Sequence, residues 1–540
     1  MVYRFLFTLF SFVLSVAFFS CKSNDKKIIT EGEQSVFNNP LIWADTPDPD
    51  VIRVGDDFYM VTTTMHLMPG GPIMKSKDLV NWEVISYIFD RIEDTPRYDL
   101  MEGTSYGNGQ WATSLKYHNG KFYALFVAND EPWKSFLYTA DKAEGPWELY
   151  SRLPFFHDCS LFFEDDGKVY VTYGSGDIRL TELNPDLKDI KEDGFNDIIV
   201  RMDDETKGLH EGSRLVKYDD YYYLMIINWP AGGPRRQLVY RSKNITGPYE
   251  RKEVMNDKFM GFPYVAQGTL VDDTDGNIWA MIFQDHDAVG RILTLSPVAF
   301  EDGWPVIGNN GKVPSSVSYI KKSDSPTKLV RSDDFDTEKL GFHWQWNHNP
   351  VNDAWSLTER PGFLRLKTSR ISESIYDAPN TISQRMEGPE SEGIVKIDLA
   401  GMNDGDVAGF GAFNGTSTLL SIKDEGGKKY LVKHNTDVTF KGKEKRIEAV
   451  KDDIEERITL ENNTIYLKIK GDFNLGKDIA YCEYSLDGKN WLPIGKPFKM
   501  TYDYRKFFMG QRFAIYNYAT KEPGGYIDVD YFKYFFPPQI

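Results

Sequence analysis

The chain has 540 residues, of which 41% are hydrophobic and 26% charged, so it is an ordinary globular chain rather than a disordered one. Its net charge of −17 argues against nucleic acid or another acidic polymer as a partner. Three cysteines are too few for a disulfide scaffold. Aromatic residues reach 14%, which favours strands and surfaces that stack on ring-shaped ligands.

Residues 1–20 have the layout of a secretory signal peptide, with Arg4 before a continuous apolar run. Small Ser20 followed directly by Cys21 resembles a bacterial lipoprotein processing site, in which the cysteine is lipidated and becomes the mature N-terminus. The polar residues 21–35 are then a lipidated tether, and the expected location is the bacterial cell envelope, periplasmic or anchored to the outer membrane. The alternative is an uncleaved membrane anchor, for which the apolar run is short.

A hairpin pattern recurs five times between residues 36 and 310. Each copy has an apolar strand, a turn of Asp, Asn or Gly, and an aromatic second strand. The second-strand aromatics are Tyr59, Tyr123, Tyr170, Tyr222 and Trp279. Intervals of roughly 50 residues suit four-stranded blades. The region is therefore predicted to form a five-bladed β-propeller.

A second repeated position precedes each of these aromatics by 11 or 12 residues. It is occupied by Asp48, Trp111, Asp158, Glu211 and Gln267. The first strand of each propeller blade lines the central channel, so equivalent positions should converge on one cavity. Three of the five side chains are carboxylic acids.

Three converging carboxylates suit the hydrolysis of a glycosidic bond. One neutral acid protonates the leaving oxygen, and one ionised carboxylate acts on the other face of the sugar. A third carboxylate can raise the pKa of the acid. Trp111 can stack on a sugar ring, and Gln267 can bind its hydroxyls. The alternatives are a Ca²⁺ site or acids that cap turns, but their equivalence within the repeat favours a functional cavity.

The C-terminal part of the chain lacks the propeller repeat. Residues 311–330 are rich in Gly, Ser, Pro and Lys and are predicted to be a linker, and residues 331–540 alternate as the strands of a β-sandwich do. No cofactor is required. A structural calcium ion is considered at Asp333, Asp334 and Asp528, with solvated turn acids as the alternative. Cys159 and Cys482 are interpreted as buried thiols.

Several stretches resemble family 43 glycoside hydrolases. They include TPDPDVIRVGDDFYMVTTT (46–64), HDCSLFFEDDGKVY (157–170) and HEGSRLVKYDDYYYL (210–224). The C-terminal region, with WQWNHNP and WSLTERPGFLRL, resembles the concanavalin-like β-sandwich, a jelly roll, that is appended to the β-xylosidases of that family. The resemblance implies an all-β chain and an inverting mechanism.

The resemblance also implies individual roles. Asp48 matches the general base that activates water, Glu211 the general acid, and Asp158 the acid that orients Glu211 and raises its pKa. Trp111 falls at the substrate-stacking position, and Arg291 where an arginine often lies near the sugar hydroxyls; a surface ion pair is the alternative for Arg291. An inverting enzyme should hold the base and the acid about 6.5–9.5 Å apart.

One departure from the family pattern bears on specificity. Met65-His66-Leu67 stands where similar β-xylosidases have Phe-Glu-Trp, which weakens the case for xylosides and favours α-L-arabinofuranosides. His66 either contacts substrate or is a packed loop histidine. Strand alternation predicts that His157 and His210 turn away from the cavity. His286 is a weak candidate ion ligand.

The predicted function is therefore that of an inverting, exo-acting glycoside hydrolase. It would remove terminal α-L-arabinofuranosyl or β-D-xylosyl residues from plant polysaccharide side chains or oligosaccharides, and would meet the membrane only through the lipid on Cys21. The alternative is a non-catalytic glycan-binding envelope lipoprotein, which would not need all three acids. An interaction propeller of WD-repeat type predicts Gly-His and Trp-Asp dipeptides in each blade, and the sequence lacks them.

Overall fold

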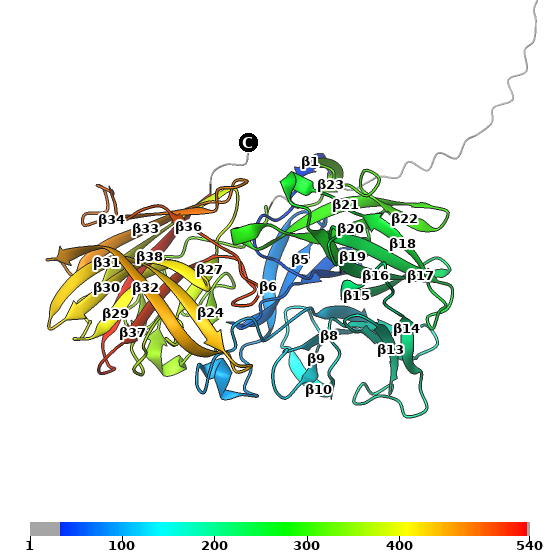
Figure 1. Cartoon of the computed structure of the whole chain (residues 1–540), viewed down its shortest axis with the longest axis horizontal. Helices are drawn as coiled ribbons and strands as arrows, with labels where there is room; N and C mark the ends of the chain where they lie inside the picture. Colours follow the sequence, from blue (N-terminus) through cyan, green and yellow to red (C-terminus); the bar gives the residue numbers. More distant parts are fainter. Residues whose placement is uncertain (1–32, 324, 537–540) are drawn as a thin grey trace, which may run out of the picture.

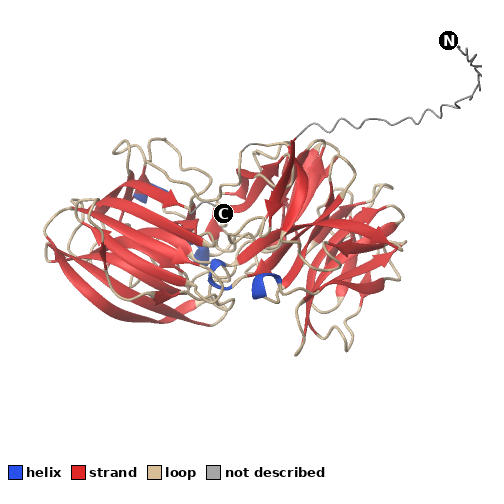
Figure 2. Cartoon of the chain, turned by 90° about the horizontal axis from the view of Figure 1, so that it is seen from above, coloured by secondary structure: helices blue, strands red, loops and turns tan. Residues whose placement is uncertain are grey.

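The computed structural model describes residues 33–323 and 325–536, and almost all regular structure in them is β-strand (Figure 2). The predicted signal peptide, Cys21 and all but the end of the predicted tether lie outside the described residues. Within the described part of the chain, no helix is long and apolar enough to cross a membrane. Two bodies lie side by side in Figure 1, one built from the first part of the chain and one from the last.

The first body is the predicted five-bladed propeller, with five antiparallel sheets of four strands each. The blades in chain order are β2 (Asp50–Val54), β3 (Asp57–Val61), β5 (Gly70–Ser76) and β6 (Trp82–Phe89); β7 (Ser114–His118), β8 (Lys121–Val127), β9 (Lys134–Ala140) and β10 (Glu148–Pro154); β11 (Ser160–Phe163), β12 (Val169–Tyr173), β13 (Ile178–Leu183) and β14 (Asn196–Val200); β15 (Gly208–Tyr218), β16 (Tyr221–Pro230), β17 (Arg236–Ser242) and β18 (Glu250–Met255); and β19 (Val265–Asp272), β20 (Ile278–Asp285), β21 (Arg291–Glu301) and β22 (Trp304–Ile307). Short 3₁₀ helices η1 (Pro96–Asp99), η2 (Phe259–Gly261) and η3 (Asp287–Val289) lie in the connections.

The repeated residues explain how neighbouring blades are joined. The five aromatics of the repeat all lie on second strands, and Tyr59 of β3 packs edge-on against Phe122 of β8 at 5.1 Å. The backbone N–H of Leu115 on β7 donates to Oδ2 of Asp50 at the start of β2 (2.8 Å). Leu215 on β15 donates in the same way to Oγ of Ser160 on β11 (3.1 Å). These bonds tie the inner strands together around the channel.

The two ends of the propeller sequence meet in a small extra sheet. β1 (Glu33–Asn38) pairs antiparallel with β23 (Ser316–Lys321). β1 begins within the predicted tether, and β23 lies within the predicted linker. The Asn39 side chain extends this junction by donating to the carbonyls of Leu295 and Pro314 (2.9 and 2.8 Å).

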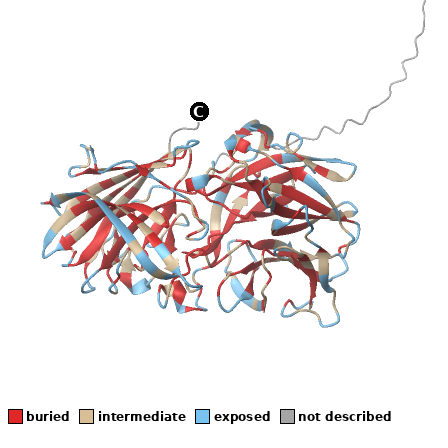
Figure 3. Cartoon of the chain, in the orientation of Figure 1, coloured by how far each residue is buried: buried red, intermediate tan, exposed pale blue. Residues whose placement is uncertain are grey.

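The second body is a sandwich of two large antiparallel sheets. One sheet has the order β32 (Arg446–Leu460), β31 (Lys428–Lys441), β30 (Thr416–Glu425), β29 (Asp406–Phe413), β37 (Arg512–Ala519), β27 (Ile382–Arg385), β24 (Gln345–Asn347) and β4 (Leu67–Met68). The other has the order β25 (Trp355–Ser356), β26 (Leu364–Lys367), β38 (Tyr526–Phe535), β28 (Glu390–Asp398), β33 (Thr464–Asp472), β34 (Ile479–Ser485) and β35 (Leu492–Pro493), with β36 (Phe498–Lys499) also on β34 and η4 (Asn352–Ala354) before β25. Buried residues fill the space between the sheets (Figure 3), including the ring cluster of Phe410, Phe513 and Phe532.

The last strand of the first sandwich sheet comes from the propeller. β4 lies in the connection between β3 and β5, and its Met68 pairs with Trp346 of β24. Beside it, the rings of His66, Tyr106, His348 and Phe507 pack within 5.4 Å of one another in successive contacts. The propeller and the sandwich therefore share both a sheet and a buried aromatic cluster.

Candidate active site

The repeated positions are marked by unusual backbone geometry. Asp48, Asp158 and Gln267 have φ angles of 55°, 46° and 71°, in the left-handed region that residues with a Cβ rarely adopt. At the fourth position β15 has a bulge between Glu211 and Arg214, and Gly212 takes φ 73° instead. Bulges and left-handed residues re-aim side chains near functional sites.

Two of the acids meet at an imidazole. Nε2 of His157 lies 2.9 Å from Oε2 of Glu211 and 3.8 Å from Oδ1 of Asp158. The ligand atoms of these three residues all lie within 4.8 Å of one another. The prediction that His157 turns away from the cavity was wrong. Strand alternation does not apply to it, because β11 begins only at Ser160 and Asp158 interrupts the extended backbone.

The third acid has its own set of partners. Oδ2 of Asp48 accepts a hydrogen bond from Oγ1 of Thr63 (2.7 Å), and Nη1 of Arg291 lies 3.3 and 3.4 Å from the two carboxylate oxygens. Arg291 is only 2% exposed, so its ion pair with Asp48 is buried and is not the surface pair considered above. The charge of Asp48 raises the pKa of both His157 and Asp158, which places all three acids in one electrostatic cluster.

The protons of the cluster are distributed unevenly. Burial raises the pKa of Asp158 to about 6; Glu211 and Asp48 act in the same direction, while His157 opposes the shift. Burial lowers the pKa of His157, but the charge of Asp158 and the hydrogen bond to Glu211 outweigh it and raise the pKa to about 9. Burial would raise the pKa of Glu211, but the bond from His157 prevails and lowers it. The expected increase in the pKa of Glu211 is therefore not found; Asp158 is the carboxyl with the raised pKa.

An aromatic wall adjoins the acids. The Trp111 ring lies 5.8 Å from the His157 ring and 5.7 Å from that of Phe508, and its Nε1 donates to the carbonyl of Gly107 (3.1 Å). Phe508 belongs to the sandwich, yet its carbonyl accepts from Nη2 of Arg291 (3.1 Å) and its ring lies 4.4 Å from that guanidinium. No local sequence signal marks Phe508 as a site residue, because it lies in a different domain from the repeat.

Gln267 lies beside the strand that carries the acid. A Cβ at Gly212 would come within 2.7 Å of the Gln267 side-chain carbon Cδ, so the glycine makes room for the glutamine next to Glu211. The backbone N–H of Gln267 donates to Oε1 of Gln237 (2.8 Å), which fixes this left-handed residue. The structure thus places Gln267 close to Glu211, as the repeat predicts.

The remaining histidines do not face the acids. His66 is 1% exposed and packs among Tyr106, His348 and Phe507, so it is the packed loop histidine and not a substrate contact. Burial lowers its pKa to about 3.

His210 bonds the carbonyl of Gly176 and the hydroxyl of Tyr240, away from the cavity as predicted. His286 is also buried, and its Nδ1 bonds Oε1 of Gln284 (3.1 Å).

A buried arginine beneath the acids was missed. Arg214 follows the Glu211 bulge and is 1% exposed. Its two terminal nitrogens donate to the backbone carbonyls of Cys159, Ser213, Thr113 and Asp48 at 3.0, 3.0, 3.1 and 3.4 Å. One guanidinium therefore connects the inner strands of four blades. A charged residue within the apolar strand that follows Glu211 was the available signal.

The three acids considered as calcium ligands each contact different side chains. Asp528 accepts from Arg360 and Arg365, Asp334 pairs with Lys533, and Asp333 accepts from the indole of Trp344 (2.9 Å). The structure does not bring these three carboxylates together around one point. Cys159 and Cys482 are both buried free thiols, as predicted.

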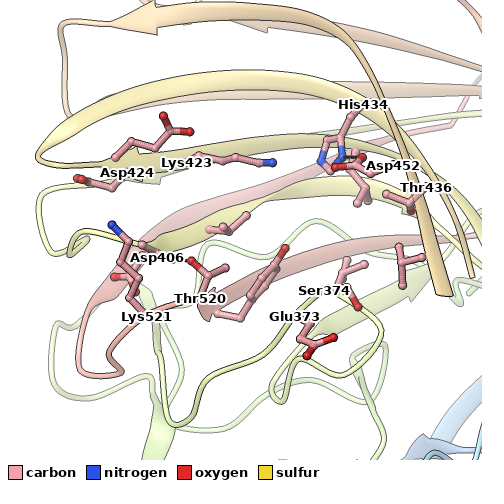
Figure 4. A pocket seen from close by; sticks show the side chains of 17 residues that line it. Glu373, Ser374, Asp406, Lys423, Asp424, His434, Thr436, Asp452, Thr520 and Lys521 are labelled. Carbon is pink, nitrogen blue, oxygen red and sulfur yellow. Dashed lines mark hydrogen bonds and ion pairs between the residues drawn. The ribbon is translucent and has the colours of Figure 1, made fainter. Parts of the chain in front are cut away.

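A separate hollow of about 310 Å³ lies in the sandwich (Figure 4). Lys423 points its amine toward the hydrogen-bonded pair of His434 and Asp452, and Asp406 and Lys521 lie at the other end. It lacks the equivalent acids of the repeat, so it is distinct from the candidate active site.

Comparisons with known proteins agree with this geometry. Residues 37–305 match the model of glycosyl hydrolases family 43, and residues 332–535 match the β-xylosidase C-terminal concanavalin A-like domain. A β-xylosidase of Formosa agariphila is 32% identical, with 92% of this chain and 90% of that protein covered. A non-reducing end α-L-arabinofuranosidase of Bacteroides ovatus is 32% identical, with 70% of this chain and 73% of that protein covered.

A solved structure shows the same arrangement of both domains. The bifunctional GH43-CE protein of Bacteroides eggerthii is 42% identical with a TM-score of 0.85, and the match covers 94% of this chain. The chain spans 64% of the length of that protein. With the paired acids of the propeller and the match to both domain models, the chain belongs to glycosyl hydrolase family 43 and is a glycoside hydrolase with a C-terminal concanavalin-like domain.

Proposed function

We propose that this enzyme removes terminal pentose residues, α-L-arabinofuranosyl or β-D-xylosyl, from plant polysaccharide side chains or oligosaccharides, with inversion at the anomeric carbon. The observation that carries the proposal is that the two carboxylates contact different residues. Asp48 contacts Thr63 and Arg291, whereas Glu211 contacts His157. Two carboxylates with different environments can take opposite roles in one reaction.

In the proposed reaction Asp48 acts as the general base. It takes a proton from a water molecule as the water oxygen attacks the anomeric carbon, and the glycosidic C–O bond breaks on the opposite face of the sugar. Arg291 and Thr63 hold the Asp48 carboxylate in one orientation in the buried site. A carboxylate that is held in one orientation suits the role of a general base.

Glu211 acts as the general acid and protonates the leaving oxygen. Because His157 lowers the pKa of Glu211, the proton resides on the imidazole before the reaction. The 2.9 Å bond lets it pass from Nε2 of His157 to Glu211, and Glu211 gives this same proton to the leaving oxygen as the glycosidic bond breaks, which returns Glu211 to its ionised form. His157 ends the step neutral and is reprotonated from solvent.

Exo action is part of the proposal, and the aromatic residues beside the acids are its support. Trp111 stacks on the terminal sugar, while Phe508 of the sandwich covers Arg291 and contacts the Trp111 ring. The similar proteins include a β-xylosidase and an α-L-arabinofuranosidase, so the proposal keeps both pentoses. The non-catalytic glycan-binding alternative is not favoured. An envelope location, with lipid on Cys21, remains a prediction from residues 1–35.

The test is product analysis by NMR during the first turnovers. The purified chain is offered nitrophenyl α-L-arabinofuranoside, nitrophenyl β-D-xyloside and the matching oligosaccharides. Release of one terminal pentose, appearing first as the opposite anomer of the substrate linkage, supports the proposal. Retained configuration, internal cleavage or no hydrolysis of either pentoside would overturn it.

A further inference from the structure

An exposed tryptophan stands at the start of a ring-to-ring path that leads to the general acid. Trp133, in the loop between β8 and β9, is 46% exposed. Its ring lies 5.8 Å from that of Phe155, which lies 6.3 Å from the nearly parallel ring of His157. His157 in turn bonds Glu211. Two ring contacts therefore connect a solvent-exposed indole to the residue beside the acid.

The backbone holds Trp133 in a costly conformation. Its φ of 56° is left-handed, which is an outlier for so bulky a residue. The loop that imposes it is anchored by the buried ion pair of Arg97 and Asp130 (2.6 Å), and the Trp133 N–H donates to the Asp130 carbonyl (2.9 Å). A well-anchored loop thus keeps a large apolar ring about half exposed to water in a costly conformation, which suits a ligand surface.

The position of the path relative to the acids identifies its ligand. It ends at His157 and Glu211, which handle the leaving oxygen in the proposed reaction. It does not end at Asp48, which is held by Arg291 and acts on the attacking water. Whatever follows the cleaved bond therefore leaves along this path. Aromatic faces stack on the C–H faces of sugar rings and carry no charge preference, which fits a neutral glycan.

We propose that Trp133 and Phe155 form a binding surface for the leaving-group part of the substrate, the sugar units of the glycan chain to which the terminal pentose is attached. This inference rests on the proposed function. It means that the preferred substrate is an oligosaccharide or polymer rather than a simple pentoside, because part of the binding energy for the transition state comes from sugars beyond the cleaved bond.

The test compares two substrates that differ only beyond the cleaved bond. One is the pentosyl fluoride, whose leaving group is a single atom; the other is a trisaccharide with the same terminal pentose. Trp133→Ala should lower kcat/KM for the trisaccharide by about five- to tenfold and leave the fluoride unchanged, since only the trisaccharide reaches the indole. Trp133→Phe should restore most of the loss.

Two further variants make the result decisive. Tyr150→Ala removes an aromatic ring of similar exposure (44%) from β10, the outermost strand of the same blade, and should change neither substrate. Trp229→Ala removes the 42% exposed indole on the fourth blade, whose ring lies 5.4 Å from that of Tyr264 just before the fifth blade. Equal losses on both substrates in Trp133→Ala, or a trisaccharide-specific loss only in Trp229→Ala, would overturn the inference. Failure of the wild type on every pentosyl substrate would instead contradict the proposed function.

Discussion

His157 and Glu211 form a partly buried hydrogen bond of 2.9 Å although they lie on the first strands of neighbouring blades or just before them. The pair shares one proton. The pair loses this proton only near the raised pKa of the imidazole, which is about 9. The basic limb of the pH–rate profile should therefore lie well above the ordinary range of a carboxyl group.

His157→Gln removes this proton store and leaves a neutral donor to Glu211. The basic limb of kcat/KM should then move to lower pH by more than one unit, because Glu211 alone must hold the proton. The pH–rate profile on a pentoside measures the shift. His118→Gln, which changes a half-buried histidine at the end of β7, should leave both limbs in place. An unmoved basic limb in His157→Gln would refute the role given to the imidazole.

Asp48→Asn and Glu211→Gln separate the base from the acid. Each should lower kcat on an unactivated oligosaccharide by about a hundred- to ten-thousandfold. With a dinitrophenyl pentoside, whose leaving group needs no proton, Glu211→Gln should recover most of its activity and Asp48→Asn should not. Steady-state kinetics on the two substrates provide the comparison, and recovery in Asp48→Asn instead would reverse the assignment.

Asp158→Asn should stabilise the folded protein at high pH. Because the pKa of Asp158 is raised to about 6 in the folded state, the folded protein ionises it less readily than the unfolded chain does, so ionisation costs stability as pH rises. The amide removes that cost, which is at most about 3 kcal/mol at pH 8 and about half of that at pH 5. Denaturant unfolding at both pH values measures the gain.

The exposed Asp165 provides the control for this variant. Asp165→Asn changes a carboxylate on the same hairpin that is 94% exposed, and it should give no comparable gain. A gain in Asp158→Asn that stays constant between pH 5 and pH 8 would show that the ionisation of Asp158 is not its source. Loss of activity in the same variant would show that the destabilising charge is kept for function.

Phe508→Ala tests the contribution of the sandwich to the reaction. The carbonyl that binds Arg291 stays, but the ring over the guanidinium and beside Trp111 is lost. We expect kcat/KM to fall by about ten- to a hundredfold through loosened positioning, with little change in Tm. Tyr504→Ala, in the same loop and 63% exposed, should have a small effect. Wild-type kinetics in Phe508→Ala would show that the Phe508 ring of the sandwich does not contribute to the reaction.

The repeat revealed most of the fold because each blade carries the same hairpin chemistry. It located Asp48, Asp158, Glu211 and Gln267 through their spacing from the second-strand aromatics, and the structure gives these positions related backbone geometry. His157 escaped the same logic because alternation holds only inside a strand, and the left-handed Asp158 turns its neighbour toward the cavity.

Other site residues depended on contacts across the chain. Phe508 reaches Arg291 from another domain, and Arg214 binds backbone carbonyls of four blades, neither of which leaves a periodic trace in the sequence. The sequence left His66 as either a substrate contact or a packed loop histidine, because nothing local shows that β4 pairs with β24 and draws the histidine into the domain interface. Local patterns therefore predicted the scaffold better than the contacts between domains.

The pairing of β4 with β24 has a consequence for anyone who recombines such enzymes. A cut between residues 311 and 330 would separate the chain where its sequence suggests a hinge, yet it would strip a strand from an eight-stranded sheet and leave hydrogen-bonding groups of β24 open at its margin. Such an unpaired margin invites self-association. Chimaeras should therefore exchange the segment that contains β4 together with the sandwich, because β4 is part of the sandwich sheet.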